Sequence, residues 1–328
     1  MESNIQPQTH VFDTLIIGGG ISGLAAALTL ARQQHTAVVL DSEEYRNAPS
    51  PYMHNVLTWD HKEPQAFRTA AKDNILATYT TIQFQKAEVD TVKETTTESG
   101  RQEFVATATD GASWTGRKVI LAVGVRDVFP QIPGYAECWA KGIYHCFFCK
   151  GYEARGAKSA GILALPDIAS APAVLHAART ALRFTECVNV YTHGSKELGD
   201  AVVQAQGNKV LFKVDNRKIE RFEKGPGFAD IIIHFDGGES VTEGFMGHKP
   251  PTEPKGNFHE QLGLEMNAML DPVVKPMFLE TSRKGVFACG DSASAIKIIP
   301  QSLFAGSAAA AAVCAQIQAE DADQACIF

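Results

Sequence analysis

Residues 12–41 read FDTLIIGGGISGLAAALTLARQQHTAVVLD, and the expected fold class follows from this segment. The apolar run at 12–17 precedes three glycines, a pattern typical of a buried parallel strand. Residues 21–32 have the spacing of a helix, and residues 36–40 form a second apolar run that closes on Asp41. The segment therefore predicts one strand–helix–strand unit of a doubly wound α/β sheet.

The turn between this strand and helix carries Gly18, Gly20 and Gly23, and Asp41 follows about twenty residues later. Such glycines let the backbone approach a pyrophosphate, whose negative charge is stabilised by the helix N-terminus. Asp41 is placed to accept hydrogen bonds from a ribose. A tight turn that binds nothing is the alternative, but the strand, helix and acid at suitable distances favour a nucleotide.

The rest of the chain continues the α/β pattern. Strands are expected at 81–92, 104–108, 117–122, 161–165, 188–192, 209–214, 230–235 and 285–288, and helices at 170–184 and 302–319. Residues 42–61 are irregular, polar and aromatic, and are candidates for a pocket wall. A glycine after 119–123 and the Pro- and Gly-rich stretch 247–256 indicate where the chain leaves and re-enters a first domain. The expected parts are 1–124, 125–246 and 247–328.

The composition is that of an ordinary globular protein. Its 328 residues suggest about two domains, with 45% hydrophobic and 20% charged residues. The net charge of −7 argues against a nucleic-acid partner. Residues 1–10 lack the basic-then-apolar pattern of a signal peptide. No apolar run reaches the ~18 residues of a membrane span, and 308–313 is expected in a buried helix. We therefore expect a cytoplasmic protein without a membrane partner.

Two of the seven cysteines, Cys146 and Cys149, are separated by two residues in the segment YHCFFCKGYE. Such a pair can close and reopen a disulfide, and so store two electrons. The same spacing is half of a zinc site, with His145 as a third ligand, but the sequence has no second CxxC or HxxxH. No metal is therefore expected. The other five cysteines are expected to be small buried side chains in a reducing compartment.

Four motifs, GGGISG, VILAVG, CFFC and GVFACGDSA, give the chain a resemblance to thioredoxin-reductase-type flavoproteins over nearly its whole length. The resemblance implies two Rossmann-like doubly wound domains, the second inserted into the first and carrying the CxxC pair. It implies FAD as cofactor, with Asp291 bonding the ribityl chain and Gln301 lining the isoalloxazine from a helix N-terminus. The implied cofactor-binding residues are Gly18, Gly20, Gly23, Asp41, Gly124, Asp291 and Gln301. Members of this family are commonly homodimers.

The nicotinamide site of that family departs from its pattern here. Positions 160–169 read AGILALPDIA, with one glycine, with Pro166, and with Asp167, which would repel a pyrophosphate. Positions 191–198 read YTHGSKEL and lack the arginine pair that holds a 2′-phosphate. Both halves of a nicotinamide site are therefore expected to be missing.

A more local resemblance, over VVLDSEEYRNAPSPYMHNVLTWDH, YAECWAKGIYHCFFCKGYE and RFEKG, is to the sulfhydryl oxidases of dithiol natural products of the gliotoxin and holomycin type. It implies a small-molecule secondary-metabolite dithiol as substrate and molecular oxygen as electron acceptor. The products would be an intramolecular disulfide and hydrogen peroxide. In this scheme a substrate thiolate attacks Cys146, and Cys149 holds the flavin-proximal position.

The sequence leaves the proton acceptor open. Lys150 stands where thioredoxin reductases have an aspartate, and the usual pKa of a lysine is too high for that role. His145, His54 and Glu153 are the candidates, and the positive charge of His145 or Lys150 would also favour a thiolate. Two other functions stay open: an NAD(P)H-dependent disulfide reductase with an unusual nicotinamide site, and a flavin-binding regulatory or scaffold protein with inert cysteines.

Overall fold

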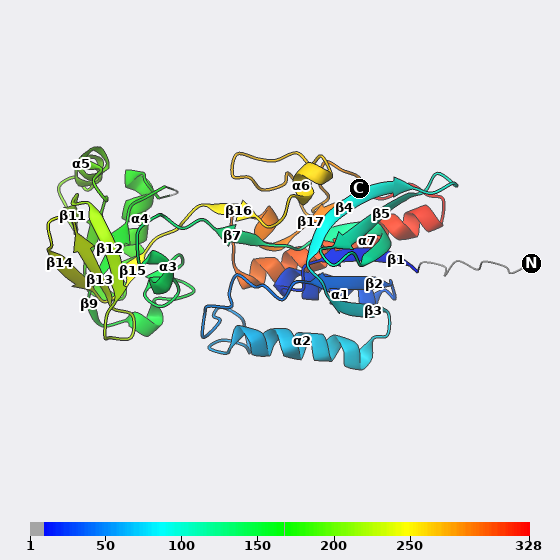
Figure 1. Ribbon diagram of the computed structural model, residues 1–328, viewed down its shortest axis with the longest axis horizontal. Coiled ribbons are helices and arrows are strands. Elements are labelled where there is room, and N and C mark those ends of the chain that lie inside the picture. Colours follow the sequence, from blue (N-terminus) through cyan, green and yellow to red (C-terminus); the bar gives the residue numbers. More distant parts are fainter. Residues whose placement is uncertain (1–9, 167) are drawn as a thin grey trace, which may run out of the picture. The chain divides into compact units, whose positions relative to one another are not determined.

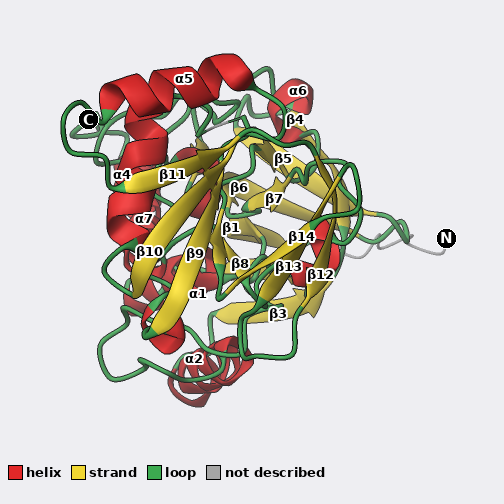
Figure 2. Cartoon of the chain, turned by 90° about the vertical axis from the view of Figure 1, so that its left-hand side faces the viewer, coloured by secondary structure: helices red, strands yellow, loops and turns green. Residues whose placement is uncertain are grey.

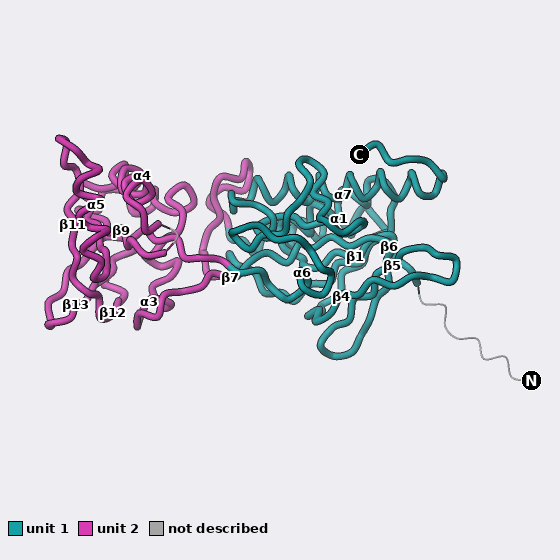
Figure 3. Tube along the Cα trace, turned by 90° about the horizontal axis from the view of Figure 1, so that it is seen from above, with its two compact units in different colours: residues 1–48, 63–126, 253–328 teal, residues 49–62, 127–252 magenta. Residues whose placement is uncertain are grey.

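The computed structural model describes residues 10–166 and 168–328, so the segment 1–9 of the signal-peptide expectation and Asp167 lie outside the described residues. The chain forms two compact units, drawn in different colours in Figure 3. Unit 1 consists of residues 1–48, 63–126 and 253–328, and unit 2 of residues 49–62 and 127–252. One α/β unit is thus inserted into another, which confirms the predicted fold class. The segment 49–62, which the sequence-based division placed in the first domain, groups with unit 2 instead.

The described part of unit 1 is built on a seven-stranded sheet of order β3-β2-β1-β6-β5-β4, with β17 beside the second half of β6 (Figure 1). β3, β2, β1, β6 and β17 are parallel, whereas β4 and β5 pair antiparallel. The elements are β1 (Val11–Ile17), α1 (Ile21–Arg32), β2 (Ala37–Asp41), α2 (Pro64–Thr78), β3 (Ile82–Lys86), β4 (Val89–Thr96), β5 (Gln102–Ala108), β6 (Ser113–Leu121), α6 (Phe258–Gln261), β17 (Val286–Ala288), the 3-10 turn η2 (Gly290–Ala293) and α7 (Ile299–Asp321).

Both faces of this sheet are covered, which is why its central strands are continuous apolar runs. Ile16 of β1 packs in one core with residues of α1 and α7. Its neighbours Leu15 and Ile17 pack in a second core with Phe104 and Phe258. This alternation follows from the two-residue period of a strand. β1 ends at Ile17, and α1 begins shortly after it at Ile21.

Helix α7 extends beyond the expected 302–319 at both ends. It packs so closely on α1 that a Cβ added to Gly306 would clash with the Ser22 carbonyl oxygen. Within the described residues it is the one helix whose length and composition would let it cross a membrane, which corrects the expectation that no segment reaches that length. In its apolar stretch 56% is buried within the fold, as in the core helix of a globular protein.

Unit 2 contains a parallel sheet of order β11-β10-β9-β15-β8 and an antiparallel sheet of order β12-β13-β14. Figure 2 shows β9, β10 and β11 side by side. The elements are α3 (Tyr135–Cys138), β8 (Ile143–Tyr144), the 3-10 turn η1 (Tyr152–Ala154), β9 (Ala157–Leu163), α4 (Ala171–Ala181), β10 (Thr185–Tyr191), α5 (Lys196–Ala205), β11 (Phe212–Asp215), β12 (Ile219–Lys224), β13 (Ile231–Phe235), β14 (Ser240–Glu243) and β15 (Met246–Gly247). The crossing segments β7 (Val125–Asp127) and β16 (Thr252–Pro254) pair with each other.

Candidate active site

The turn from β1 to α1 is shaped by its glycines. Gly18 has a φ of +107°, which residues with a side chain rarely adopt, and a Cβ there would lie 2.5 Å from the Ala122 carbonyl oxygen. A Cβ on Gly23 would clash with the Gly18 carbonyl oxygen, so α1 packs this closely on β1 only with glycine. Gly20 faces open space, since no described atom beyond its chain neighbours lies within 4 Å of an ideal Cβ. No described side chain caps α1, so its first N–H groups are available to an anion.

Asp41 lies beside this turn, where a Cβ on Gly19 would clash with its carboxylate. The Tyr45 hydroxyl donates a hydrogen bond to Asp41 Oδ2 at 2.6 Å. The guanidinium of Arg68 stacks over the Tyr45 ring, 3.8 Å from its centroid. Arg68 is buried, burial lowers its pKa, and its Nε has no hydrogen-bond partner among the described residues. This unsatisfied donor near Asp41 suits a ligand oxygen, and sequence reasoning did not identify it.

Asp291 lies in η2, against the first turn of α1. Gly290 has a φ of +75°, and a Cβ there would lie 2.5 Å from Ser22 Oγ. The Asp291 carboxylate accepts a hydrogen bond from Arg46 Nη1 at 2.9 Å. Lys297 Nζ donates to the Asp291 carbonyl oxygen at 2.7 Å. Arg46 thereby ties η2 to the loop that follows Asp41.

Gly124 and Gln301 complete the predicted cofactor-binding set. Gly124 follows β6 with a φ of +70°, and an ideal Cβ there meets no described atom within 4 Å. Gln301 is half-buried in the first turn of α7, whose N-terminus also lacks a described side-chain cap. Ser302, in the same turn, lies 3.8 Å from the ideal Cβ of Gly290, so α7 begins beside η2.

The structure therefore gathers the glycine turn, Asp41 and Asp291 around the N-termini of α1 and α7. Two uncapped helix N-termini suit a pyrophosphate and a second electron-rich group. The open face of Gly20 and the unsatisfied Nε of Arg68 are what a bound dinucleotide would fill and satisfy. These residues fit a flavin dinucleotide, while the contact assigned to each of them stays a prediction.

The CxxC pair lies in unit 2, in the loop after β8. Cys146 and Cys149 form a disulfide with their Cα atoms 5.3 Å apart, and both side chains are half-buried. The Cys149 N–H donates to Cys146 Sγ at 3.1 Å. A backbone donor aimed at this sulfur will stabilise it as a thiolate once the disulfide opens.

The two charged neighbours of the pair differ in position. The exposed His145 ring stacks on Trp139 with centroids 5.7 Å apart. Lys150 turns away, because its Nζ donates to the Ala140 carbonyl oxygen at 3.2 Å. Burial lowers the pKa of Lys150. Lys150 is thus held by the backbone of the α3–β8 connection rather than aligned as a replacement for the family's aspartate.

The segment 49–62 brings further polar side chains to the CxxC loop. Asn55 Nδ2 donates to the Phe148 carbonyl oxygen at 2.8 Å. His54 Nε2 lies 3.3 Å from Glu153 Oε1, so two of the predicted candidate bases form one pair. His61 approaches the same carboxylate, and the three possible ligand atoms lie within 4.8 Å of one another. The sequence did not indicate this two-histidine, one-carboxylate cluster.

The five other cysteines are unbonded. Cys138, Cys289 and Cys314 are buried, as expected. Burial raises the pKa of Cys289 to about 12 and that of Cys138 to about 11, which keeps both as thiols. The expectation was wrong for Cys187, which is exposed near the start of β10, and Cys326 is only half-buried.

The turn from β9 to α4 stands where the second dinucleotide motif would be. β9 ends at Leu163 and α4 begins only at Ala171, whereas β1 ends at Ile17 and α1 begins at Ile21. Ile168 is buried in the core of unit 2, so an apolar side chain occupies the longer turn. At the β9–α4 turn, Pro172 also removes one N–H donor from the first turn of α4.

Residues 191–198, where a 2′-phosphate site is expected to be missing, contain no arginine. His193, after β10, accepts a hydrogen bond from the Ile219 N–H at 3.1 Å. The nearby Arg217 is paired with Asp215 at 2.6 Å and also with Glu239.

A disulfide in one α/β unit and a dinucleotide cradle in the other define the class, a flavin-type disulfide oxidoreductase. A family model described as pyridine nucleotide-disulphide oxidoreductase matches residues 12–158. Thioredoxin reductase aclD of Aspergillus oryzae is 42% identical over 309 residues, covering 94% of this chain and 96% of that protein. A thioredoxin reductase of Gibberella zeae is 40% identical over 342 residues, covering 95% and 99%. The crystal structure of HlmI is 28% identical, covers 97% of this chain and 96% of its own, and has a TM-score of 0.84.

The chain belongs to the thioredoxin reductase family. Membership makes it an oxidoreductase of the pyridine-nucleotide-disulphide type and implies a flavin cofactor, which agrees with the cradle in unit 1.

Proposed function

We propose that the protein is an FAD-dependent dithiol oxidase that closes an intramolecular disulfide in a small secondary-metabolite dithiol, with molecular oxygen as electron acceptor. The observation that carries this proposal is the turn from β9 to α4. Its length, the buried Ile168 and the proline in the first turn of α4 remove the features that hold a pyrophosphate. A family member with a redox disulfide and without a nicotinamide site receives its electrons from a thiol.

The first chemical step is thiol–disulfide exchange. A substrate thiolate attacks Cys146 Sγ, and Cys149 leaves as a thiolate. The second substrate thiol then attacks the mixed disulfide, closes the product ring and releases Cys146. The Cys149 N–H, 3.1 Å from Cys146 Sγ, stabilises the negative charge on this leaving sulfur.

Both substrate protons need an acceptor near the CxxC loop. The His54–Glu153 pair supports this role best, because a carboxylate beside an imidazole fixes the orientation of the ring. His145 is exposed and stacked on Trp139, where it adds positive charge beside Cys146 when protonated.

Gly18, Gly20, Gly23, Asp41, Gly124, Asp291 and Gln301 are the residues that would hold FAD. When bound, the flavin takes the electron pair from the reduced cysteines and delivers it to oxygen. Overall, one dithiol and one O₂ give one disulfide and one H₂O₂. The resemblance to the thioredoxin reductase family supports a homodimer, for which light scattering should give twice the chain mass. The cysteine usage supports a reducing compartment and so a cytoplasmic location.

The second candidate is an NADPH-dependent disulfide reductase, because the relatives in Aspergillus oryzae and Gibberella zeae are named thioredoxin reductases. The two functions differ in their electron donor. Under nitrogen, the oxidase predicts that a small dithiol bleaches the flavin and NADPH does not. The reductase predicts the reverse, and a protein with inert cysteines predicts bleaching by neither.

A further inference from the structure

An open groove of about 520 Å³ lies in unit 2 beside the loop that carries the redox disulfide. Phe147 and Phe148, the two residues between the cysteines, form part of its wall. Phe148 is 76% exposed and therefore offers an open aromatic surface to the groove. Tyr152 and Phe184 add two more aromatic rings. The volume is that of a small-molecule site.

The groove is also lined by arginines. α4 buries Val174, Leu175 and Ala178 in the core of unit 2, which leaves Arg179 and, just past its end, Arg183 directed to the groove. Arg179 lies in the last turn of α4 and Arg183 in the turn that follows the helix, and both line the groove. His176 and Thr180 lie on the same side.

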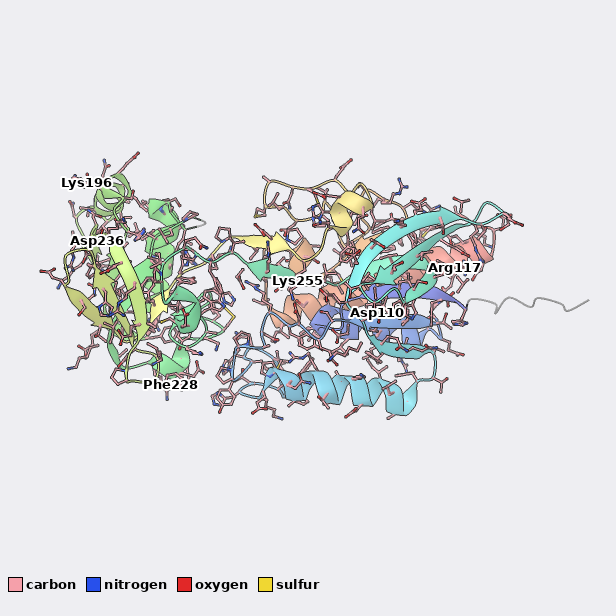
Figure 4. All side chains as sticks on the ribbon, viewed as in Figure 1. Asp110, Arg117, Lys196, Phe228, Asp236 and Lys255 are labelled. Atoms are coloured by element: carbon pink, nitrogen blue, oxygen red, sulfur yellow. A yellow bond between two sulfur atoms is a disulfide. The ribbon has the colours of Figure 1, made fainter. Side chains whose placement is uncertain are left out.

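None of the groove arginines has a carboxylate within 4.0 Å in the described part of the chain. Arg155, the third of them, donates to the Tyr152 carbonyl oxygen at 2.8 Å, and its guanidinium stacks 4.0 Å from the Tyr152 ring centroid. Some cations elsewhere in unit 2 do have a carboxylate partner: Lys196 (Figure 4) pairs with Asp200 at 2.6 Å, and Arg221 with Glu223 at 2.7 Å. Unpaired arginines gathered beside aromatic rings are an arrangement for binding an anion.

This groove is not a displaced nicotinamide site. In doubly wound sheets, dinucleotides bind at the carboxyl ends of the strands and the N-terminus of the following helix. The groove instead uses the C-terminal half of α4 and the loop before β9. Phe147 and Phe148, which line the groove, are the two residues between Cys146 and Cys149 in the sequence.

We infer that this groove binds a small dithiol with an apolar body and a carboxylate or similar anionic group, and presents it to the disulfide. The inference rests on the proposed oxidase function and specifies its substrate class. The anionic group binds Arg179, Arg183 or Arg155, and the apolar body lies on the aromatic wall. Exchange then moves two electrons and two protons from the substrate dithiol to Cys146 and Cys149, and the substrate leaves as a disulfide.

Dihydrolipoate and dihydrolipoamide test this inference, because they share one dithiol and differ in a single carboxylate. The purified flavoprotein is mixed with each under nitrogen, and the rate of flavin bleaching is measured against concentration. We expect the second-order rate constant for dihydrolipoate to exceed that for dihydrolipoamide at least tenfold, about 1.4 kcal/mol. The preference should shrink as salt is raised, since the groove is open to solvent.

Two variants locate the effect. Arg179→Gln combined with Arg183→Gln should bring the ratio of the two rate constants close to one. Lys209→Gln, which removes the same type of charge from an exposed position of unit 2 outside the groove, should keep the ratio. Calorimetric titration with the oxidised probes, lipoate and lipoamide, gives the same comparison without any turnover.

Equal rate constants and equal binding of the two probes would overturn the inference and leave the oxidase function standing. If neither dithiol bleaches the flavin while NADPH does, the oxidase function fails, and the calorimetric comparison still decides whether the groove selects anions. A salt-sensitive reaction with thioredoxin, without discrimination between the two small probes, would assign the arginines to a protein partner and also overturn the inference.

Discussion

Substitutions of two glycines in the β1–α1 turn distinguish what the fold of unit 1 requires from what cofactor binding requires. Gly23 is needed by the fold, because a Cβ there would clash with the Gly18 carbonyl oxygen. Gly20 is not, because its Cβ would project into open space and its φ of −71° suits alanine. We therefore expect Gly23→Ala to destabilise the protein, and Gly20→Ala to weaken flavin binding while the fold stays intact.

The magnitudes follow from these contacts. Overpacking of a tight contact costs about 1–3 kcal/mol, which lowers the melting temperature by roughly 2–4 °C per kcal/mol for a domain of this size. Gly23→Ala should therefore melt about 2–12 °C lower than the wild type, with or without flavin. Gly20→Ala costs roughly 0.5–1 kcal/mol at its helix N-cap position, because alanine is a poorer N-cap residue than glycine. The added methyl group would occupy the space in which the backbone comes close to the pyrophosphate. We therefore expect the affinity for the flavin to be at least tenfold weaker.

The assay is differential scanning fluorimetry of the flavin-free proteins, followed by FAD titration of each. Without flavin, Gly20→Ala should melt no more than about 4 °C below the wild type, and it should fail to gain the wild-type increase on addition of FAD. If Gly20→Ala binds FAD as well as the wild type, the cradle assigned to this turn is wrong. If Gly23→Ala melts like the wild type, the packing argument is wrong.

Three further predictions concern other groups. Cys146→Ser and Cys149→Ser should each abolish dithiol-dependent oxygen uptake with flavin still bound, and normal uptake by either variant would make the pair structural. Asp291→Ala should weaken FAD binding by roughly 1.5–3 kcal/mol in equilibrium dialysis, and Arg46→Gln, which removes the partner of that carboxylate, by less; an unchanged affinity in Asp291→Ala would remove it from the site. Burial lowers the pKa of His248 to about 4, so the unfolded chain takes up the proton first as the pH falls. The contribution of neutral His248 to the free energy of unfolding is fully present above pH 6.5, and roughly 3 kcal/mol of it is lost as the pH falls to about 4. In urea unfolding, His248→Gln should flatten this pH dependence, and an unchanged slope would contradict the assignment.

The strand–helix–strand segment at residues 12–41 was predictable because each of its signals is local. The apolar runs, the glycines and the terminal acid lie within one short stretch, and the helix matches its predicted bounds, Ile21–Arg32. Other elements lacked such signals. Helix α2 was missed because it buries only Pro64, Arg68 and Ile75, which form no continuous apolar stripe.

The boundaries that differed have local physical causes. The expected strand at 81–92 is two strands, β3 and β4, because the alternating pattern continues through the turn between them. Helix α7 begins before the expected residue 302, because Pro300 is tolerated in a first helical turn.

The site was predictable only where its residues share a motif. The flavin motifs and the CxxC pair are visible in the sequence. The pairing of His54 with Glu153 joins positions far apart in the chain, and only the packing of segment 49–62 in unit 2 brings them together. The groove beside the disulfide likewise combines the CxxC loop with α4, and charge counts alone do not reveal that its arginines are unpaired.

The electron donor is the property that separates the proposed function from that of a reductase. The direct measurement is the flavin absorbance of the purified protein under nitrogen after addition of NADPH, and separately of a small dithiol, with oxygen then admitted. The account predicts bleaching by the dithiol alone, and recovery of the flavin with one H₂O₂ formed per disulfide. Bleaching by NADPH at a rate comparable with turnover would contradict it and would make the protein a reductase.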